Sequence, residues 1–278
     1  MGNSAGMLVR PGTDLRGLTK DVVRSYRQNG MSTFAGAIAF RVVLALIPFL
    51  LFVLALLGFL DLQEVWHSDV APEIKKNASD VAFKLIDETV RQVLSQKEVW
   101  WLTIGLGLTL WELSAATRHT MFALDCVYGH PRRRGLIEVL PRSLALGTAM
   151  GICVVVAIAI VRFSPLLTGD VHGVLAALSF LIRWLLAAAV LAFGVGLVVR
   201  FGPVRPQSVS WVSLGTGLVL LSWVLTSIAF GLYATYVASY TSVFGHLASI
   251  FVLLLYLWLS ANAFLVGIQV DACIRERA

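Results

Sequence analysis

Residues 33–60 form the stretch that most constrains how this chain can fold. They read TFAGAIAFRVVLALIPFLLFVLALLGFL, 28 residues in which the only charge is Arg41 and the only helix breaker is Pro48. An α-helix needs about 20 predominantly apolar residues to cross a bilayer. The stretch therefore predicts a membrane-spanning helix.

Arg41 and Pro48 are both unusual inside such a helix. A charged side chain at the centre of a span costs roughly 2.5–3.5 kcal/mol on insertion scales, so we expect Arg41 to face protein, water or an acidic partner. Proline removes a backbone donor and usually kinks a helix, so we expect Pro48 to act as a hinge. Two interpretations stay open for this stretch: a packed span, or part of a solute path.

The rest of the chain continues this pattern. Of its 278 residues, 58% are hydrophobic and 14% charged, which lies outside the range of soluble proteins. We therefore expect an all-α polytopic membrane protein. Its six transmembrane helices are placed at about 33–60, 100–122, 143–161, 174–199, 209–233 and 247–270.

The predicted domain organisation follows from these spans. A cytoplasmic tail at 1–32 precedes a single six-helix membrane domain at 33–274, and a short cytoplasmic tail follows at 275–278. A basic connection runs from 126 to 141 between the second and third spans, and a turn from 162 to 173 between the third and fourth. Lys and Arg are concentrated on the side that holds both termini, so the positive-inside rule predicts that both termini are cytoplasmic.

Two segments outside the spans have the periodicity of amphipathic helices. Apolar residues recur at helical spacing from Leu15 to Gln28, and Arg16, Lys20, Arg24 and Arg27 occupy the other side. This predicts a basic helix on the membrane surface; a nucleic-acid-binding helix is the less favoured alternative. A second, extracytoplasmic helix is expected at about 72–94, within an outer helical loop at 61–98.

Arg41 and Glu112 are predicted to form an intramembrane ion pair. Arg41 lies eight residues beyond Thr33, about 12 Å deep at ~1.5 Å per residue. Glu112 lies ten residues before Phe122, about 15 Å deep on a helix running the opposite way. Because each charge needs a partner at that depth, we expect the two side chains to meet.

Arg183 is then a positive charge without an evident partner in the fourth span. It could extend to the outer interface, or it could contact an anion or an acidic lipid headgroup together with Arg162. On the last span, Asn262 and Gln269 lie seven residues apart on roughly one face, and we expect them to form hydrogen bonds between helices.

The sequence contains no pattern typical of an enzyme active site or a metal site. The five histidines are scattered, and the three cysteines form no CxxC motif. We therefore predict no catalytic residues, no metal and no cofactor, and we do not expect an enzyme.

Three stretches carry a resemblance to a known family. They are AGAIAFRVVLALIPFLL at 35–51, LWELSAATRHTMFALDCVYG at 110–129, and the long segment from 209 to 272 that ends in LSANAFLVGIQVDA. With these the chain resembles the YihY/BrkB family of bacterial inner-membrane proteins, formerly mislabelled as ribonuclease BN. The resemblance implies a six-helix inner-membrane bundle whose activity is not settled. Arg41 and Glu112 depart from the residues that many members have there.

Two functions are expected from these observations. The first is a transporter- or permease-like protein for an anionic solute or lipid. The alternative is a non-catalytic envelope scaffold or assembly factor, in which the two amphipathic helices engage partners. We expect contact with membrane lipids and no nucleic acid.

Overall fold

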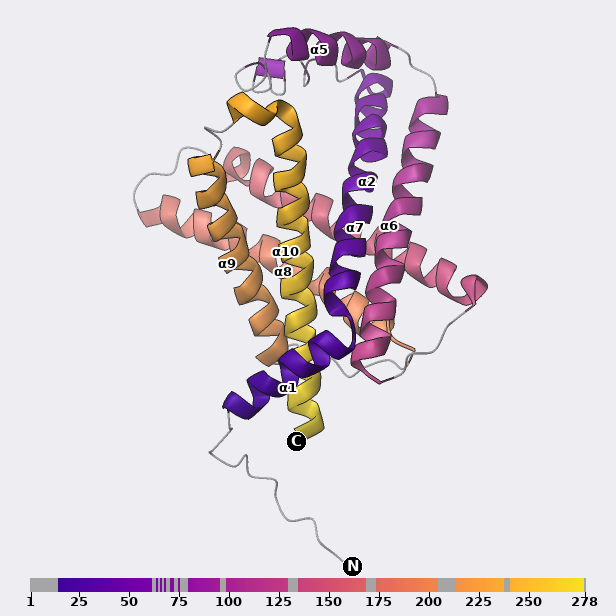
Figure 1. Cartoon of the computed structure of the whole chain (residues 1–278). Helices are drawn as coiled ribbons and strands as arrows, with labels where there is room; N and C mark the ends of the chain where they lie inside the picture. The colour runs from indigo at the N-terminus through magenta and orange to yellow at the C-terminus, as the bar shows by residue number, and fades with distance from the viewer. Residues whose placement is uncertain are drawn as a thin grey trace, which may run out of the picture. The chain divides into compact units, whose positions relative to one another are not determined.

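The computed structural model describes residues 15–61, 64, 66, 68, 71–72, 75, 80–95, 99–129, 135–168, 174–204, 214–237 and 241–277. Within these ranges all the regular structure is helical (Figure 1). The helices are α1 (Leu15–Gln28), α2 (Met31–Phe59), α5 (Asp80–Ser95), α6 (Val99–Val127), α7 (Leu136–Thr168), α8 (Val174–Phe201), α9 (Leu214–Val237) and α10 (Thr241–Arg277). The predicted all-α fold class is confirmed.

Among the described residues, five helical segments are long and apolar enough to cross a membrane. They are Met31–Phe59, Val99–Val127, Ile137–Val161, Leu178–Phe201 and Phe251–Ile274. A shorter apolar segment, Leu221–Tyr233, lies within the 24-residue helix α9. The chain is thus a multi-pass membrane protein, as predicted, whereas the number of six spans and the cytoplasmic position of both termini stay predictions.

Helix α7, which contains the third predicted span, extends beyond that span at both ends. We expected the span at 143–161 between a basic connection and a turn, but α7 begins at Leu136 and ends at Thr168. Both Arg142 and Pro165 lie inside this helix. A charge or a proline ends a run of apolar residues, which is what the prediction detected. The helix itself can continue past such a residue, because a basic side chain near a helix end can extend toward water.

The chain divides into two compact units. The first comprises residues 1–36, 122–132 and 203–278, and the second comprises 37–121 and 133–202. The first unit therefore holds α1, α9 and α10, and the second holds α5, α7, α8 and most of α2 and α6. The border between the units falls inside α2 and inside α6.

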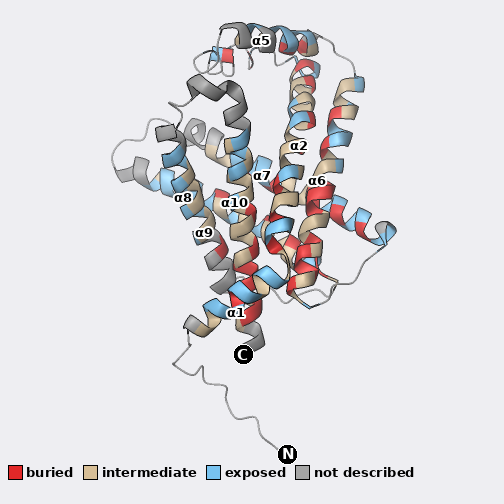
Figure 2. Cartoon of the chain, in the orientation of Figure 1, coloured by how far each residue is buried: buried red, intermediate tan, exposed pale blue. Residues whose placement is uncertain are grey.

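Helix α10 organises the first unit. It packs along α9, and α1 crosses it (Figure 1). Among the side chains of α10 that the structure describes, from 251 to 274, the buried ones gather toward the C-terminus, where Leu265, Ile268 and Cys273 are covered (Figure 2). Gly267 permits the close contact with α9, because a Cβ atom at this position would lie 2.1 Å from Cγ2 of Val219.

In the second unit, glycines bring neighbouring helices into backbone contact. A Cβ atom at Gly105 of α6 would lie 2.8 Å from the backbone nitrogen of Phe52 in α2. A Cβ atom at Gly147 of α7 would lie 2.9 Å from Oγ1 of Thr117 and 3.1 Å from the backbone of Leu113, both in α6. Small residues of this kind let membrane helices approach closely. They fix α2 and α7 against α6.

Helix α1 has the bounds that its amphipathic pattern predicted. It ends in a short turn at Gly30, whose φ of +63° suits glycine, and α2 starts at Met31. Tyr26 donates a hydrogen bond to Oδ1 of Asn262, and Nδ2 of Asn29 donates to Oε1 of Gln269 at 3.4 Å. The polar residues of α10 thus bond to α1 and to the turn after it.

Helix α5 covers residues 80–94 of the amphipathic helix expected at 72–94, and most of the expected positions before residue 80 lie outside the described residues. Val90 and Leu94 on its apolar face are buried with Trp66 and contact Leu54 and Leu57 of α2. Trp66 Nε1 and Arg91 Nε both donate to the carboxylate of Asp87, at 2.9 and 2.8 Å. The helix therefore packs against the end of α2 through an apolar cluster.

Candidate functional site

A charged pair joins α2 to α6 in the second unit. Nη1 of Arg41 lies 3.1 Å from Oε2 and 3.4 Å from Oε1 of Glu112, so one guanidinium nitrogen donates to both carboxylate oxygens. The structure thus brings together the two residues whose depths in the sequence matched. The contact between Gly105 and Phe52 holds the two helices close enough for these side chains to reach each other.

The two members of the pair differ in exposure. The side chain of Arg41 is 36% exposed, whereas that of Glu112 is 18% exposed. Phe40 beside Arg41 is exposed, and Ala39 and Ala45 on the same helix are buried. Glu112 is therefore the enclosed member, and Arg41 is the member that a molecule from outside the helices could reach.

Arg118 adds a second guanidinium group to this region. It lies six residues after Glu112 on α6. Its Nη1 donates to Oγ of Ser114 at 2.8 Å, and its Cζ atom lies 5.6 Å from the centre of the Trp111 ring. Long side chains on a helix point back toward its N-terminus. The Arg118 guanidinium therefore lies at the level of the turn that carries Glu112, where it interacts electrostatically with both Arg41 and Glu112.

Two buried serines extend the cluster to α7. Oγ of Ser114 lies 2.8 Å from Oγ of Ser143, and Ser143 donates to the carbonyl of Leu140 at 3.0 Å. A hydroxyl has one proton. Since the Ser143 proton goes to Leu140, Ser114 donates to Ser143 and accepts from Arg118. The cluster thus consists of the pair Arg41–Glu112 and the relay Arg118–Ser114–Ser143, which we call the α6 charge cluster.

Threonines on α6 bond to their own helix instead. Thr109, Thr117 and Thr120 donate to backbone carbonyls four residues earlier, at 2.6, 2.8 and 3.1 Å. Such bonds remove the cost of a hydroxyl in an apolar setting. The serines differ from these threonines because their hydroxyls connect separate helices.

Arg183, the other predicted intramembrane charge, lies apart from the cluster on α8. Its Cζ atom is 4.9 Å from the centre of the Phe180 ring, one turn nearer the N-terminus of α8. Its Nε is buried and has no hydrogen-bond partner among the described residues. Arg162 lies within α7, but its side chain is outside the described residues. Pro48 lies inside α2, where it is buried.

Sequence reasoning missed some of the polar contacts near these helices. No partner was predicted for Arg118 or Asp125, and Ser114 and Ser143 were not singled out. Oδ1 of Asp125 accepts a hydrogen bond from the backbone nitrogen of Val204 at 2.8 Å in the first unit. Uncharged serines in an apolar run give little signal, because most of them bond to their own helix.

Among the described residues, no group of three or more His, Cys, Asp or Glu side chains could hold a metal ion. The described cysteines are free thiols: Cys126 is partly exposed, and Cys153 and Cys273 are buried. The chemistry of the α6 charge cluster is therefore that of guanidinium, carboxylate and hydroxyl groups. Such groups can bind and exchange anions.

Comparison with known proteins identifies the family. The family model described as virulence factor BrkB matches residues 22–278, so the chain belongs to that family, as its sequence resemblance predicted. A ribonuclease-like protein, YfkH, of Bacillus subtilis (strain 168) is 26% identical over 266 residues, which cover 93% of this chain and 95% of the relative. No solved structure matches the chain.

Proposed function

We propose that this BrkB-family membrane protein is a transporter- or permease-like protein of the bacterial inner membrane that moves an anionic solute or lipid. The observation that supports the proposal most is the α6 charge cluster. It holds two guanidinium groups, Arg41 and Arg118, and one carboxylate, Glu112, within helices apolar enough to cross a membrane. Its excess positive charge would attract an anion strongly in such a setting of low dielectric constant.

The unequal exposure of the ion pair suggests how an anion would bind. Glu112 is the more enclosed partner and serves as an internal counter-ion for Arg41. An arriving anion competes with Glu112 for the Arg41 guanidinium, which is accessible from one side. Breaking and remaking this pair would then accompany each binding event, as expected for a gate.

Pro48 supplies a place where α2 could bend during this exchange. It follows Arg41 by seven residues, about 10 Å along the helix at ~1.5 Å per residue. Proline leaves a carbonyl in the preceding turn without its usual backbone donor, which weakens the helix locally. We propose that bending at this hinge changes the access to Arg41.

Arg183 is proposed as a second anion contact, with Arg162 assisting it. The buried Nε of Arg183 has no acceptor among the described residues, and a phosphate or carboxylate oxygen would supply one. The stacking on Phe180 would hold the guanidinium plane in place for such a contact.

We further propose that the protein acts without covalent chemistry and without a cofactor. In the α6 charge cluster the hydroxyls of Ser114 and Ser143 donate to oxygen acceptors, and the Glu112 carboxylate accepts from Arg41. None of these groups is arranged as a nucleophile with its base. Their arrangement suits reversible binding.

Flux measurements on the purified chain in proteoliposomes test this function. Chloride, phosphate and a fluorescent acidic phospholipid would be followed separately for the native protein, Glu112→Gln and Arg41→Gln. We expect native flux of one of these anions, a lower half-saturating concentration in Glu112→Gln because the internal competitor is gone, and loss of flux in Arg41→Gln. A tenfold decrease in the half-saturating concentration corresponds to ~1.4 kcal/mol for the competition of Glu112 with the anion.

Arg91→Gln provides the matched control for this experiment. Arg91 also forms an ion pair, with Asp87 at 2.8 Å, but on α5 and mostly exposed. The anion flux of Arg91→Gln should equal that of the native chain. If folded native protein moves none of the anions, the proposed function is wrong.

The alternative of a non-catalytic envelope scaffold or assembly factor is favoured by α5. Its apolar face is buried against α2, while Lys84, Glu88 and Arg91 remain exposed and available to a partner. Loss of the cellular phenotype in Lys84→Glu/Arg91→Glu, together with normal behaviour of Arg41→Gln, would support the scaffold over the transporter.

A further inference from the structure

Helix α1 uses one of its faces to pack against α10. Val22 is buried, and Tyr26 of the next turn bonds to Asn262. Leu18, one turn earlier, is partly buried. The residues at this spacing therefore form the packing face, and the exposed Val23 is not part of it.

The opposite face of α1 carries three bases around this exposed valine. Lys20, Arg24 and Arg27 are exposed, and Val23 is 46% exposed. None of the three bases forms an ion pair or a hydrogen bond with its side chain within the described part of the chain. Asp21, the acid of α1, does not line the same surface.

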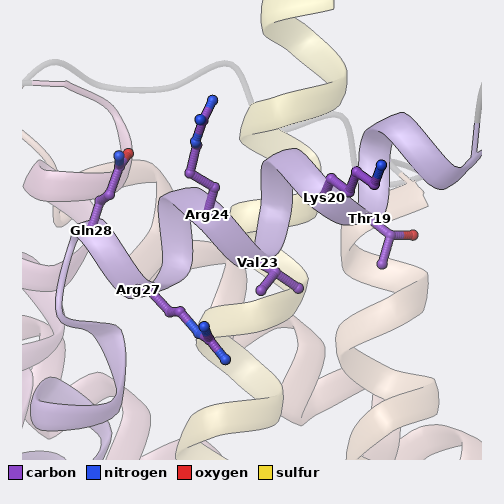
Figure 3. Close-up of a pocket in the computed structure, with 6 residues that line it drawn as sticks. All are labelled: Thr19, Lys20, Val23, Arg24, Arg27 and Gln28. Atoms are coloured by element: carbon purple, nitrogen blue, oxygen red, sulfur yellow. The ribbon is translucent and has the colours of Figure 1, made fainter.

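These side chains border a shallow open hollow. Its lining comprises Thr19, Lys20, Val23, Arg24, Arg27 and Gln28, which come from two adjacent rows of the helix (Figure 3). Thr19, Val23 and Arg27 follow one another at intervals of four residues, and Lys20, Arg24 and Gln28 form the row beside them. In Figure 3 Arg24 points to one side of the helix and Val23 and Arg27 to the other, so cationic head groups and an apolar side chain border the same hollow.

The hollow lies next to the start of a membrane span. Only Asn29 and Gly30 separate the last residue of α1, Gln28, from Met31, where the apolar helix α2 begins. The C-terminal end of α1 is thereby tied to the level where a bilayer begins. At that level the phosphate groups of lipids meet their acyl chains.

We propose that this face of α1 binds the headgroup of an anionic phospholipid. Lys20, Arg24 and Arg27 contact the phosphate oxygens, and Val23 contacts the apolar region below them. A nucleic acid is a poorer fit, because it offers no apolar surface for Val23 and would have to reach a helix held at the membrane. This site is separate from the α6 charge cluster and does not depend on transport.

Binding of short-chain lipids to the detergent-purified full chain tests the proposal. The probes are dioctanoyl phosphatidylglycerol, dioctanoyl phosphatidylcholine, inorganic phosphate and a single-stranded RNA oligonucleotide. We expect the native chain to prefer phosphatidylglycerol over phosphatidylcholine. Since one juxtamembrane base contributes about fivefold in affinity, Lys20→Gln/Arg24→Gln/Arg27→Gln should lose on the order of a hundredfold of the binding of phosphatidylglycerol.

A matched variant separates the site from net charge. Lys84→Gln/Arg142→Gln/Arg200→Gln removes three exposed bases from other helices and should bind phosphatidylglycerol like the native chain. Val23→Ser should weaken binding of phosphatidylglycerol and leave that of inorganic phosphate unchanged. Equal losses in the two triple variants, or phosphate bound as tightly as phosphatidylglycerol, would overturn the proposal.

Two further outcomes also decide the question. Binding of RNA that disappears with the three α1 bases would make this face a nucleic-acid site and would refute the lipid assignment. If the triple variant does not fold, Arg24→Gln alone is measured, with the resistance of the α1–α10 contact to protease as the check on folding. Native affinity for phosphatidylglycerol in folded Arg24→Gln counts against the proposal.

Discussion

Nη1 of Arg41 on α2 lies 3.1 Å from Oε2 of Glu112 on α6, and the arginine side chain is twice as exposed as the carboxylate side chain. The same region holds Arg118, which reaches back along α6 to Ser114. Glu112 is therefore the carboxylate that offsets two guanidinium groups. The two members of the pair should respond unequally to mutation.

We predict that Glu112→Gln lowers the free energy of unfolding more than Arg41→Gln. Without Glu112, two guanidinium groups face each other and neither can lose its proton. Without Arg41, the Glu112 carboxylate still has the Arg118 guanidinium near it. We expect a loss of about 2 kcal/mol for Glu112→Gln, below the ~3–5 kcal/mol of fully buried pairs because Arg41 is partly exposed.

A double-mutant cycle measured by unfolding in mixed micelles checks this prediction. Arg41→Gln/Glu112→Gln should be more stable than Glu112→Gln alone, with a coupling energy of about 1 kcal/mol or more. Additive losses would show that the pair contributes nothing beyond its separate members.

The relay of hydroxyls predicts an order of effects for Ser114 and Ser143. Ser143→Ala removes one acceptor, and the Ser114 hydroxyl can rotate to another acceptor. The free energy of unfolding should therefore fall by only about 1 kcal/mol. Ser114→Ala leaves both the Arg118 donor and Ser143 without their partner, so the loss should reach about 2 kcal/mol or more. Unfolding of the two single variants and the double variant measures this order. An equal cost for both variants would contradict the proton assignment.

The meeting of Arg41 and Glu112 could be anticipated from the sequence because helical rise fixes depth. Two charges of opposite sign at similar depth on adjacent antiparallel spans have few alternatives to pairing. The involvement of Arg118 could not be anticipated in the same way, since the direction of its side chain places the guanidinium a turn or more from its own Cα. Ser114 and Ser143 could not be anticipated either, because an uncharged serine in an apolar run does not require a partner on another helix.

The bounds and contacts of the helices could likewise be predicted from the sequence only in part. The bounds of α1 were predicted correctly because its amphipathic spacing defines both the apolar face and the length over which the pattern continues. The ends of α7 were missed because the charges of Arg142 and Arg162 were taken as helix limits. The contact of Tyr26 with Asn262 bridges 236 positions, and hydrophobic periodicity holds no information on which distant helix supplies a partner. Asn262 and Gln269 were nevertheless expected to bond between helices, because a polar side chain in a span needs a partner.

Two glycines on α6 should differ sharply when each is replaced by alanine. A Cβ atom at Gly105 would lie 2.8 Å from the Phe52 nitrogen, whereas one at Gly107 meets nothing within 4 Å. Gly105→Ala should therefore force α2 and α6 apart and cost about 1–3 kcal/mol. Gly107→Ala has the same chemistry without the contact and should be neutral or stabilise the helix by up to about 1 kcal/mol.

Thermal unfolding in detergent compares these two variants. Gly105→Ala should also weaken the ion pair, because Glu112 lies two turns further along the same helix. A Gly105→Ala protein as stable as Gly107→Ala would show that α2 and α6 do not need this close contact.

The hydrogen bond of Tyr26 to Asn262 should make the docking of α1 sensitive to alkaline pH. Burial raises the pKa of Tyr26 above its ordinary value of 10.0, since the phenolate would lose its solvation. A group whose pKa is raised on folding contributes its full stabilisation below the pKa of the unfolded state. That contribution is lost as the pH rises from about 10 through the raised pKa.

We therefore expect α1 to exchange its backbone amides faster above pH 10 than the apolar helix α8, once the intrinsic exchange rates are divided out. Tyr26→Phe removes both the bond and the titrating group. Its α1 should exchange about fivefold faster at neutral pH, in line with the ~1 kcal/mol of one hydrogen bond, and should show no added rise above pH 10. If Tyr26→Phe keeps the alkaline rise of the native chain, another group causes it, and the Tyr26–Asn262 bond does not control the docking of α1.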